Sequence, residues 1–534
     1  MKYIYQTLLF FFLGSILFTS CKDRETEKSP SENDTVVQAD EDFRPDFHFT
    51  PKSGWMNDPN GMFYLDGTYH LFFQHNPDDN VWGPMHWGHA TSTDMINWEE
   101  QPIALEPDEH GTIFSGSAVV DHENTSGLGD GETPPVIAIF TYHDADREQE
   151  GEDDFQTQGI AYSLDAGKTW TKYEENPVLD NPGIRDFRDP KVIWYEEENK
   201  WIMSLAVQDH ISFYSSSNLL DWQHESDFGQ ALGGHGGVWE CPDLFPMQVE
   251  DTEEEKWVLL VSINPGGPNG GSATQYFVGD FDGSTFTPDE SIADLGEEHD
   301  YWIDFGKDNY AGVTWSNIPE EDGRHLFIGW MSNWQYANEV PTETWRSAMT
   351  LPRDLNLTQQ ENTYRIVSTP VRELNQYSSE RISESSVEIE DSTSLATSAD
   401  LDLSKAEILF EIPQLQQNQQ YTFSLSNDKG DVLKFGYDHG KEEFFIDRSN
   451  SGLVDFNDNF GDKISSAPRL SESKNLKVRA ITDNMSIELF FDEGQTVMTE
   501  IFFPQQAFKN FSAESDQSFK ISDFKINQLK HNQE

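Results

Sequence analysis

Short apolar runs recur along the first two thirds of the chain at a nearly constant spacing. Each run is rich in β-branched or aromatic residues and is bounded by turn formers, which is typical of buried β-strands. The five runs are Tyr69–Gln74, Val136–Tyr142, Trp201–Val207, Trp257–Ile263 and Leu326–Ser332. Successive runs begin between 56 and 69 residues apart. The region has no sustained helical period, so the pattern predicts an all-β fold.

A shorter apolar run precedes each of the five, and acidic or glycine-containing turns separate the two, as in β-hairpins. The shorter runs are Gly61–Leu65, Ser117–Asp121, Lys191–Tyr195, Leu244–Val249 and Tyr310–Trp315. Further strand and turn signals follow, for example Ser163–Trp170. A repeat of this length made of about four strands is typical of one β-propeller blade. Five repeats therefore predict a five-bladed β-propeller.

A polar cluster stands immediately before the first predicted strand of each repeat. The clusters are Asn57–Asn60, Phe114–Gly116, Arg188–Pro190, Glu240–Asp243 and Asp308–Asn309. Because the first strand of each blade lines the central channel, we expect the clusters to converge at one end of it. Asp58, Asp189 and Glu240 would then meet, although they lie far apart in the sequence.

Two carboxylates that face one bond are the minimum for glycoside hydrolysis, one as an acid and one as a nucleophile or base. A third acid can bind sugar hydroxyls, and Arg188 beside Asp189 would keep that acid ionised. Each cluster alone is better explained as a turn or a solvated ion pair than as part of a site. Their equivalent places in three repeats favour a shared site, and the nearby aromatic residues could stack on sugar rings.

The charge of the chain limits its partners. Lys and Arg number 35 against 96 Asp and Glu, which gives a net charge of −61. Phosphates would be repelled, so nucleic acid and anionic membrane surfaces are excluded as partners. A neutral substrate is compatible with this surface.

The N-terminus has the features of an export signal. Lys2 precedes an apolar run from Leu8 to Phe18 that is too short to span a bilayer comfortably. The segment Phe18–Cys21 resembles the bacterial lipoprotein cleavage box, which predicts a lipid on Cys21. The expected location is the periplasm or the cell surface, with membrane attachment only through this lipid. Ordinary secretion with cleavage near Cys21 is the alternative.

The motifs, taken in order, resemble glycoside hydrolase family 32, which includes invertases, inulinases and levanases. The resemblance rests on Trp55–Gly61, Phe114–Ser117, Arg188–Pro190, Glu240–Asp243, Trp82–Ala90, Gly329–Tyr336 and Trp345–Met349. It covers roughly residues 44–355. It implies a five-bladed propeller, in agreement with the repeat count.

The resemblance also implies residue roles. Asp58 would be the nucleophile, Asp189 the transition-state stabiliser and Glu240 the general acid/base. Contacts to a terminal fructosyl unit would come from Asn57, Gln74, Trp82, Phe114, Ser115, Arg188 and Trp334. A looser match adds Asp308 as a further substrate contact. No metal or organic cofactor is implied.

These roles describe a retaining β-fructosidase that cleaves fructans or sucrose through a covalent fructosyl–enzyme. Retention requires the Asp58 and Glu240 carboxyl groups to lie about 5–5.5 Å apart. Exo action is expected because the residues match a pocket for a terminal fructose. The alternatives are an endo-acting fructanase, an inverting propeller glycosidase such as an arabinan hydrolase, and a non-catalytic glycan-binding propeller.

The last third of the chain changes character. Short strand candidates such as Tyr421–Ser426 and Ser486–Phe491 alternate with turns and predict an antiparallel β-sandwich. Ser378–Ser398 is rich in Ser and Glu and is expected to be a connecting stretch with at most one strand. The predicted domains are a signal segment (1–21), a disordered tether (22–43), the propeller (44–365) and the sandwich (366–534).

Overall fold

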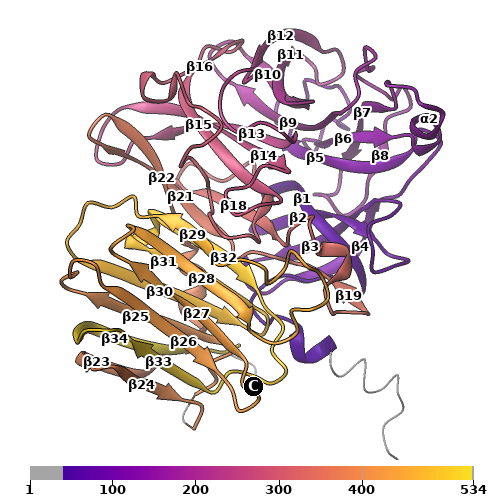
Figure 1. Cartoon of the computed structure of the whole chain (residues 1–534). Coiled ribbons are helices and arrows are strands. Elements are labelled where there is room, and N and C mark those ends of the chain that lie inside the picture. Colours follow the sequence, from indigo (N-terminus) through magenta and orange to yellow (C-terminus); the bar gives the residue numbers. More distant parts are fainter. Residues whose placement is uncertain (1–39, 400, 532–534) are drawn as a thin grey trace, which may run out of the picture.

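The computed structural model describes residues 40–399 and 401–531. These residues form a β-propeller followed by a β-sandwich (Figure 1). Among them, no helix has the length and apolar character needed to cross a membrane. Cys21 and the predicted signal segment lie outside the described residues.

The propeller is built from five antiparallel sheets that follow one another along the chain, one for each sequence repeat. The first holds β1 (Gly54–Leu65), β2 (Thr68–Asn76), β3 (His86–Ser92) and β4 (Glu99–Leu105). The second holds β5 (Thr112–Val120), β6 (Val136–His143), β7 (Gln156–Ser163) and β8 (Thr171–Lys172). The third holds β9 (Phe187–Tyr195), β10 (Lys200–Val207), β11 (His210–Ser216) and β12 (Gln223–Phe228). The fourth holds β13 (Val238–Gln248), β14 (Glu255–Asn264), β15 (Ala273–Phe281) and β16 (Phe286–Pro288). The fifth holds β17 (Tyr310–Thr314), β18 (His325–Met331), β21 (Arg353–Gln360) and β22 (Thr363–Pro370), with β20 (Ala348–Met349) paired to β18.

The first strand of each sheet lies at the centre of the propeller. β1 contacts β5, β5 contacts β9, β9 contacts β13, β13 contacts β17, and β17 contacts β1, so the inner strands close a ring. The chain also closes the ring through β19 (Trp345–Arg346), which pairs in parallel with the start of β1. Large aromatic side chains fill the space between sheets, and Trp55, Trp87 and Trp330 are fully buried. Each such side chain contributes about 1.5–3 kcal/mol relative to an exposed one.

The sandwich consists of two six-stranded sheets. One contains, in spatial order, β23 (Ser378–Ile389), β34 (Phe519–Leu529), β25 (Ala406–Ile412), β30 (Leu476–Asp483), β31 (Ser486–Phe491) and β32 (Thr496–Ile501). The other contains β24 (Ser392–Thr397), β33 (Asn510–Glu514), β26 (Gln420–Ser426), β27 (Val432–Asp438), β28 (Glu443–Asn450) and β29 (Ser465–Pro468). Helical segments are few and short: α2 (Ala145–Glu150), η1 (Glu290–Ile292), η2 (Ala337–Glu339), η3 (Arg372–Tyr377) and η4 (Asp492–Gly494).

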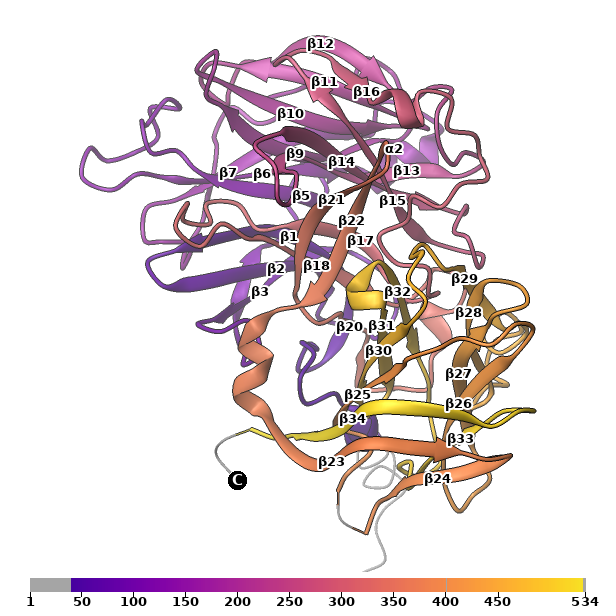
Figure 2. The same cartoon turned by 90° about the vertical axis from the view of Figure 1, so that its left-hand side faces the viewer.

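Three segments differ from the expectation from sequence. The stretch expected to connect the domains forms two strands, β23 and β24, which are sheet edges with mostly exposed polar side chains. The last propeller strand, β22, continues to Pro370, and η3 then leads into β23 (Figure 2). At the other end, residues 40–43, which were predicted to belong to the tether, are packed against the propeller. Asp40 is buried and accepts hydrogen bonds from the Glu343 and Thr344 backbone N–H groups.

Buried ion pairs join the propeller to the sandwich. Arg353 of β21 is fully buried and bonds Asp304 at 2.9 Å and Glu488 of β31 at 2.5 Å. Arg448 of β28 bonds Asp308 at 2.6 Å. Because an unpaired buried charge is costly, these pairs fix how the sandwich docks on the fifth sheet.

Candidate active site

Each inner strand of the propeller is irregular at its polar cluster or directly beside it. Four of the clusters lie inside the strands, not before them as the sequence predicted, because β1, β5, β9 and β13 begin one to three residues upstream of their clusters. The fifth cluster, Asp308–Asn309, directly precedes β17. The pairing register shifts at Met56/Pro59, Ile113/Gly116, Arg188/Lys191, Glu240/Asp243 and Tyr310/Val313. A β-bulge re-aims side chains and increases the local twist. The bulges of the first four inner strands therefore turn the polar side chains of their clusters toward one end of the channel.

Three non-glycine residues at these bulges have a left-handed backbone. The φ angle is 64° at Asp189, 46° at Cys241 and 53° at Ala311. Such conformations cost on the order of 1–3 kcal/mol and persist where the surrounding structure fixes them. Here the backbone N–H of Asp189 donates to Thr141 Oγ1 at 2.9 Å, and that of Cys241 donates to Asp189 Oδ2 at 3.1 Å.

A cavity of about 280 Å³ lies at this end of the channel. Its lining includes all ten residues for which the family resemblance implies catalytic or substrate-binding roles: Asn57, Asp58, Gln74, Trp82, Phe114, Ser115, Arg188, Asp189, Glu240 and Trp334. The structure therefore brings together residues from all five sheets, as the convergence argument expected.

Asp58 of β1 is held by donors on two sheets. Asn57 Nδ2 donates to Asp58 Oδ1 at 2.9 Å, and Ser115 Oγ of β5 donates to Asp58 Oδ2 at 2.7 Å. Asn57 is itself oriented by the Trp55 indole N–H at 2.7 Å. Burial raises the pKa of Asp58, and the charge of Glu240 raises it further, whereas the Asn57 and Ser115 hydrogen bonds oppose the shift. The carboxylate thus points into the cavity with both oxygens positioned.

Glu240 of β13 is also bonded at both oxygens. Arg188 Nη2 donates to Oε1 at 2.9 Å, and the Tyr310 hydroxyl donates to Oε2. Tyr310 is a residue that the sequence analysis missed. It opens the inner strand of the fifth sheet, beside the Asp308–Asn309 cluster, so its place in the repeat was the available signal.

Asp189 of β9 is the third acid of the cluster. Its pKa is raised to about 7 as the net effect of burial, which raises it, the charge of Arg188, which lowers it, and the charges of Glu240 and Asp58, which raise it. Arg188 Nε lies 3.9 Å from Asp189 Oδ2, farther than its contacts with Glu240 and with Asp186 at 2.6 Å. Arg188 is therefore shared among three acids and is not the dedicated partner of Asp189 that the sequence suggested.

Aromatic rings surround the mouth of the cavity. Trp82 is 44% exposed and meets Phe114 edge to face at 6.0 Å between ring centroids. Trp334 stacks on the buried Trp55 at 5.8 Å. These rings offer faces on which a sugar can stack.

Other residues that line this cavity were not predicted from the sequence to be part of the site. They are His143, Glu148, Phe155, Gln156 and Asp186. His143 ends β6 and pairs with Thr112 at the start of β5, so hairpin register places it at the active end of the second sheet. The hairpin pattern was therefore a usable signal for His143.

The expected substrate contact at Asp308 is wrong. Asp308 is fully buried and accepts hydrogen bonds from Tyr336, Arg448 and the Ile501 backbone N–H. Asp308 belongs to the interface with the sandwich, because its carboxylate forms an ion pair with Arg448 of β28.

A small pocket with clustered carboxylates, an arginine and exposed indole faces is typical of one class of protein, the glycoside hydrolases. Family comparison agrees. Residues 48–370 match the N-terminal domain of glycosyl hydrolases family 32, and residues 372–528 match the C-terminal domain of that family. The chain belongs to glycosyl hydrolase family 32.

Individual relatives match over most of the chain. A levanase from Bacillus subtilis (strain 168) is 45% identical over 92% of this chain and 71% of its own length. An extracellular exo-inulinase from Aspergillus ficuum is 40% identical over 87% of this chain and 90% of its own length.

Solved structures agree in fold. The exo-inulinase from Aspergillus awamori superimposes with a TM-score of 0.83 at 36% identity, covering 91% of this chain and 98% of its own. A fructofuranosidase variant from Schwanniomyces occidentalis, complexed with fructosylnystose, gives a TM-score of 0.82 at 33% identity, covering 92% of this chain and 99% of its own.

Proposed function

We infer that the protein is an exo-acting, retaining β-fructosidase that releases terminal fructose from fructans and also cleaves sucrose. The observation that carries this inference is the placement of Asp58 and Glu240 in one small cavity, each bonded at both carboxylate oxygens. Levanase and exo-inulinase relatives support the fructan part, and fructofuranosidase structures support the choice of fructosyl bonds.

In the proposed first step, Glu240 protonates the leaving oxygen while Asp58 attacks the anomeric carbon of the fructosyl unit. Ser115 and Asn57 aim the attacking carboxylate. In the second step, Glu240 takes a proton from water, which attacks the fructosyl–Asp58 ester from the face that the leaving group vacated. Two displacements at one carbon retain its configuration.

Asp189 and Arg188 would stabilise the charges that are present as the glycosidic bond breaks. The carboxylate of Asp189, in its ionised form, stabilises positive charge on the ring as the bond breaks. Arg188 bonds Glu240 and balances the negative charge of the cluster.

Exo action follows from the size of the cavity. At about 280 Å³ it lies at the small end of ligand pockets, which span about 300–1,000 Å³. A site of this size suits one terminal sugar, with the next units stacking against Trp82 at the rim. An endo-acting fructanase would need an open groove along the catalytic acids. A binding propeller would have no need of an acid/base pair.

We also propose export of the protein, since the exo-inulinase relatives are described as extracellular. Lipid attachment at Cys21 would then hold the enzyme on the membrane, with a polar tether between the lipid and the propeller.

Chromatography of early products from levan, inulin and sucrose tests the function. Free fructose as the sole early product from the two polymers is expected, and fructose plus glucose from sucrose. A ladder of oligosaccharides would replace exo with endo action. No product from any of the three would overturn the proposed activity.

A further inference from the structure

A second cavity, of about 570 Å³, lies at the opposite end of the propeller channel from the active site. It is lined by residues at the C-terminal ends of inner strands whose N-terminal ends carry the catalytic cluster. Val119 and Val120 end β5, which starts near Ser115, and Trp194 lies five residues beyond Asp189 on β9. Five strand residues span roughly 17 Å, so the two cavities are on opposite faces of the propeller.

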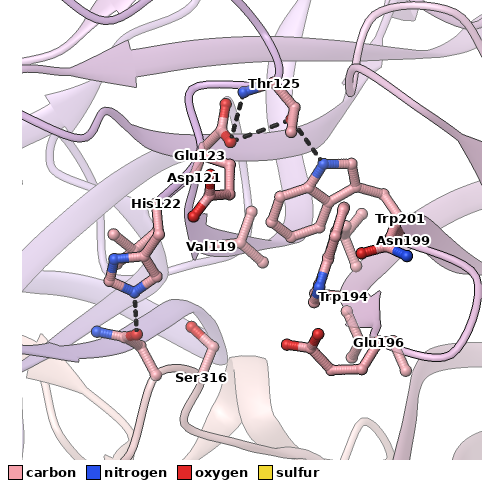
Figure 3. Close-up of a pocket in the computed structure, with 14 residues that line it drawn as sticks. Val119, Asp121, His122, Glu123, Thr125, Trp194, Glu196, Asn199, Trp201 and Ser316 are labelled. Carbon is pink, nitrogen blue, oxygen red and sulfur yellow. Dashed lines mark hydrogen bonds between the residues drawn. The ribbon is translucent and has the colours of Figure 1, made fainter. Parts of the chain in front are cut away.

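One wall of this cavity is a pair of tryptophans from the third sheet (Figure 3). Trp194 and Trp201 are cross-strand partners whose rings meet edge to face, 4.9 Å apart. The Trp201 indole N–H is bonded to Thr125 Oγ1 at 2.9 Å, which fixes its ring. Trp194 remains partly exposed, and its indole N–H bonds none of the residues drawn in Figure 3. It therefore offers both a face and a donor to a ligand.

Polar side chains surround the tryptophans. Figure 3 shows Glu123 across the cavity from Trp194, with Glu196 and Asn199 beside the indole. Among the described residues, neither Glu123 nor Glu196 has a side-chain hydrogen bond or ion pair. By contrast, the Asp121 carboxylate is satisfied, because it caps the Thr125 and Ser126 backbone N–H groups at 2.8 Å. The free acceptors are thus those nearest the open space.

The chemistry of the lining selects a ligand class. The described residues that line the cavity include no lysine or arginine, and a net charge of −61 repels anions, so phosphates and acidic polymers are disfavoured. The described residues contain no group of three His, Cys, Asp or Glu side chains placed to hold a metal ion. Indole faces combined with carboxylate and amide acceptors are suited to a neutral saccharide, whose hydroxyls donate while its ring stacks.

We propose that this cavity is a second, non-catalytic site that binds a β-fructan chain, with Trp194 stacking on a furanose ring and Glu123 and Glu196 accepting hydroxyl hydrogen bonds. The choice of a fructan rests on the proposed function, because the polymer is then the saccharide that the enzyme meets. Binding there keeps long chains attached to the enzyme while their free ends remain able to reach the catalytic cavity, which raises the effective concentration of those ends. The hydrolysis of sucrose would not be affected by such a site.

The test uses two variants of the cavity. Trp194→Ala removes the stacking face, and Glu196→Gln removes an exposed charge that supports no other contact in the described chain. Trp222→Ala is the matched control, since Trp222 is a partly buried tryptophan of the same sheet's periphery outside this cavity. Trp194→Phe serves as the conservative variant that keeps an aromatic face.

Two readouts separate the cavity from the active site. Retardation in native gels that contain levan or inulin is measured in the Asp58→Asn background, and kcat/KM on polymer and on sucrose is measured in the active background. We expect Trp194→Ala and Glu196→Gln each to weaken polymer retardation and raise KM on polymer, by roughly three- to tenfold for the tryptophan. Sucrose kcat/KM stays unchanged, Trp194→Phe restores binding, and Trp222→Ala behaves as the parent.

Unchanged retardation and polymer KM in both cavity variants would overturn the proposal, as would equal loss on polymer and on sucrose in Glu196→Gln. Failure of the proposed function itself is distinguishable, since the unmodified protein would then cleave neither sucrose nor polymer.

Discussion

Ser115 Oγ donates a 2.7 Å hydrogen bond to Asp58 Oδ2, joining the inner strands of the first two sheets at the catalytic cluster. The two residues are 57 positions apart in the sequence. Their contact requires the bulges of both strands, because each bulge turns its side chain into the channel. The same bond favours the ionised form of Asp58 and orients the carboxylate into the cavity, as the proposed attack on the fructosyl carbon requires.

Ser115→Ala should therefore lower kcat/KM and shift its acid limb to higher pH. The bond favours the Asp58 carboxylate, so its loss raises a pKa that burial already raises. Hydrogen bonds to charged groups contribute about 1.5–3 kcal/mol, which corresponds to a decrease of roughly 10- to 100-fold. The pH profile of sucrose hydrolysis measures both effects. A profile and rate equal to those of the parent would contradict this role of Ser115.

Glu240→Gln should reduce turnover of sucrose by roughly 10²–10⁴-fold, because it removes proton transfer to the leaving oxygen. With β-fructofuranosyl fluoride, whose leaving group needs no protonation, the formation of the fructosyl–enzyme should be nearly unaffected. The acid limb should also move to lower pH, since the charge of Glu240 raises the pKa of Asp58. Glu298→Gln, at an exposed position, is the control. Equal losses on both substrates would argue against an acid role.

His48 should make stability depend on pH. Burial alone would lower its pKa, but hydrogen bonds from its ring to Asp483 and Glu488, with the charges of both acids, raise it to about 9. Because the pKa is higher in the folded protein, protonation of His48 stabilises the fold. This stabilisation is fully present below the unfolded pKa of 6.5 and is lost as pH rises through about 9.

The comparison with His48→Gln isolates that contribution. The difference in free energy of unfolding between parent and variant should shrink by about 3 kcal/mol from pH 6 to pH 9.5. Denaturant titrations at several pH values measure it. A difference that stays constant with pH would mean that His48 is neutral in the folded protein.

Arg448→Met should destabilise the junction between propeller and sandwich. The substitution leaves Asp308 and Glu500 buried without their cation, which costs about 3–5 kcal/mol. Lys434→Met removes a cation from an exposed pair with Glu514 and should change stability by about 1 kcal/mol or less. Denaturant midpoints compare the two, and similar small effects would contradict the structural importance of the buried pair.

The sequence predicted the fold and the site best where the repeat puts equivalent residues at equivalent positions of successive sheets. Five buried runs with a common spacing predicted five sheets, and their equivalent starts predicted that Asp58, Asp189 and Glu240 would meet. The repeat could not reveal side-chain partners, because these depend on bulges that displace the register by one residue. Arg188 accordingly bonds Glu240 more closely than Asp189.

Polar segments were harder to assign. β23 and β24 are sheet edges, so one side of each strand faces solvent and the apolar alternation that marks a strand is weak. Asp308 looked like a channel residue because it precedes an inner strand. Its carboxylate is instead neutralised by Arg448, which lies 140 residues away in the other domain and has no local signature.

The central claim, that Asp58 attacks the fructosyl carbon, has a direct test. The Glu240→Gln variant is incubated with β-fructofuranosyl fluoride, quenched with acid, digested, and its peptides are weighed by mass spectrometry. Without its base the variant hydrolyses the intermediate slowly, so the peptide that contains Asp58 should carry one fructosyl residue. No adduct, or an adduct on the peptide that contains Asp189, would contradict the mechanism.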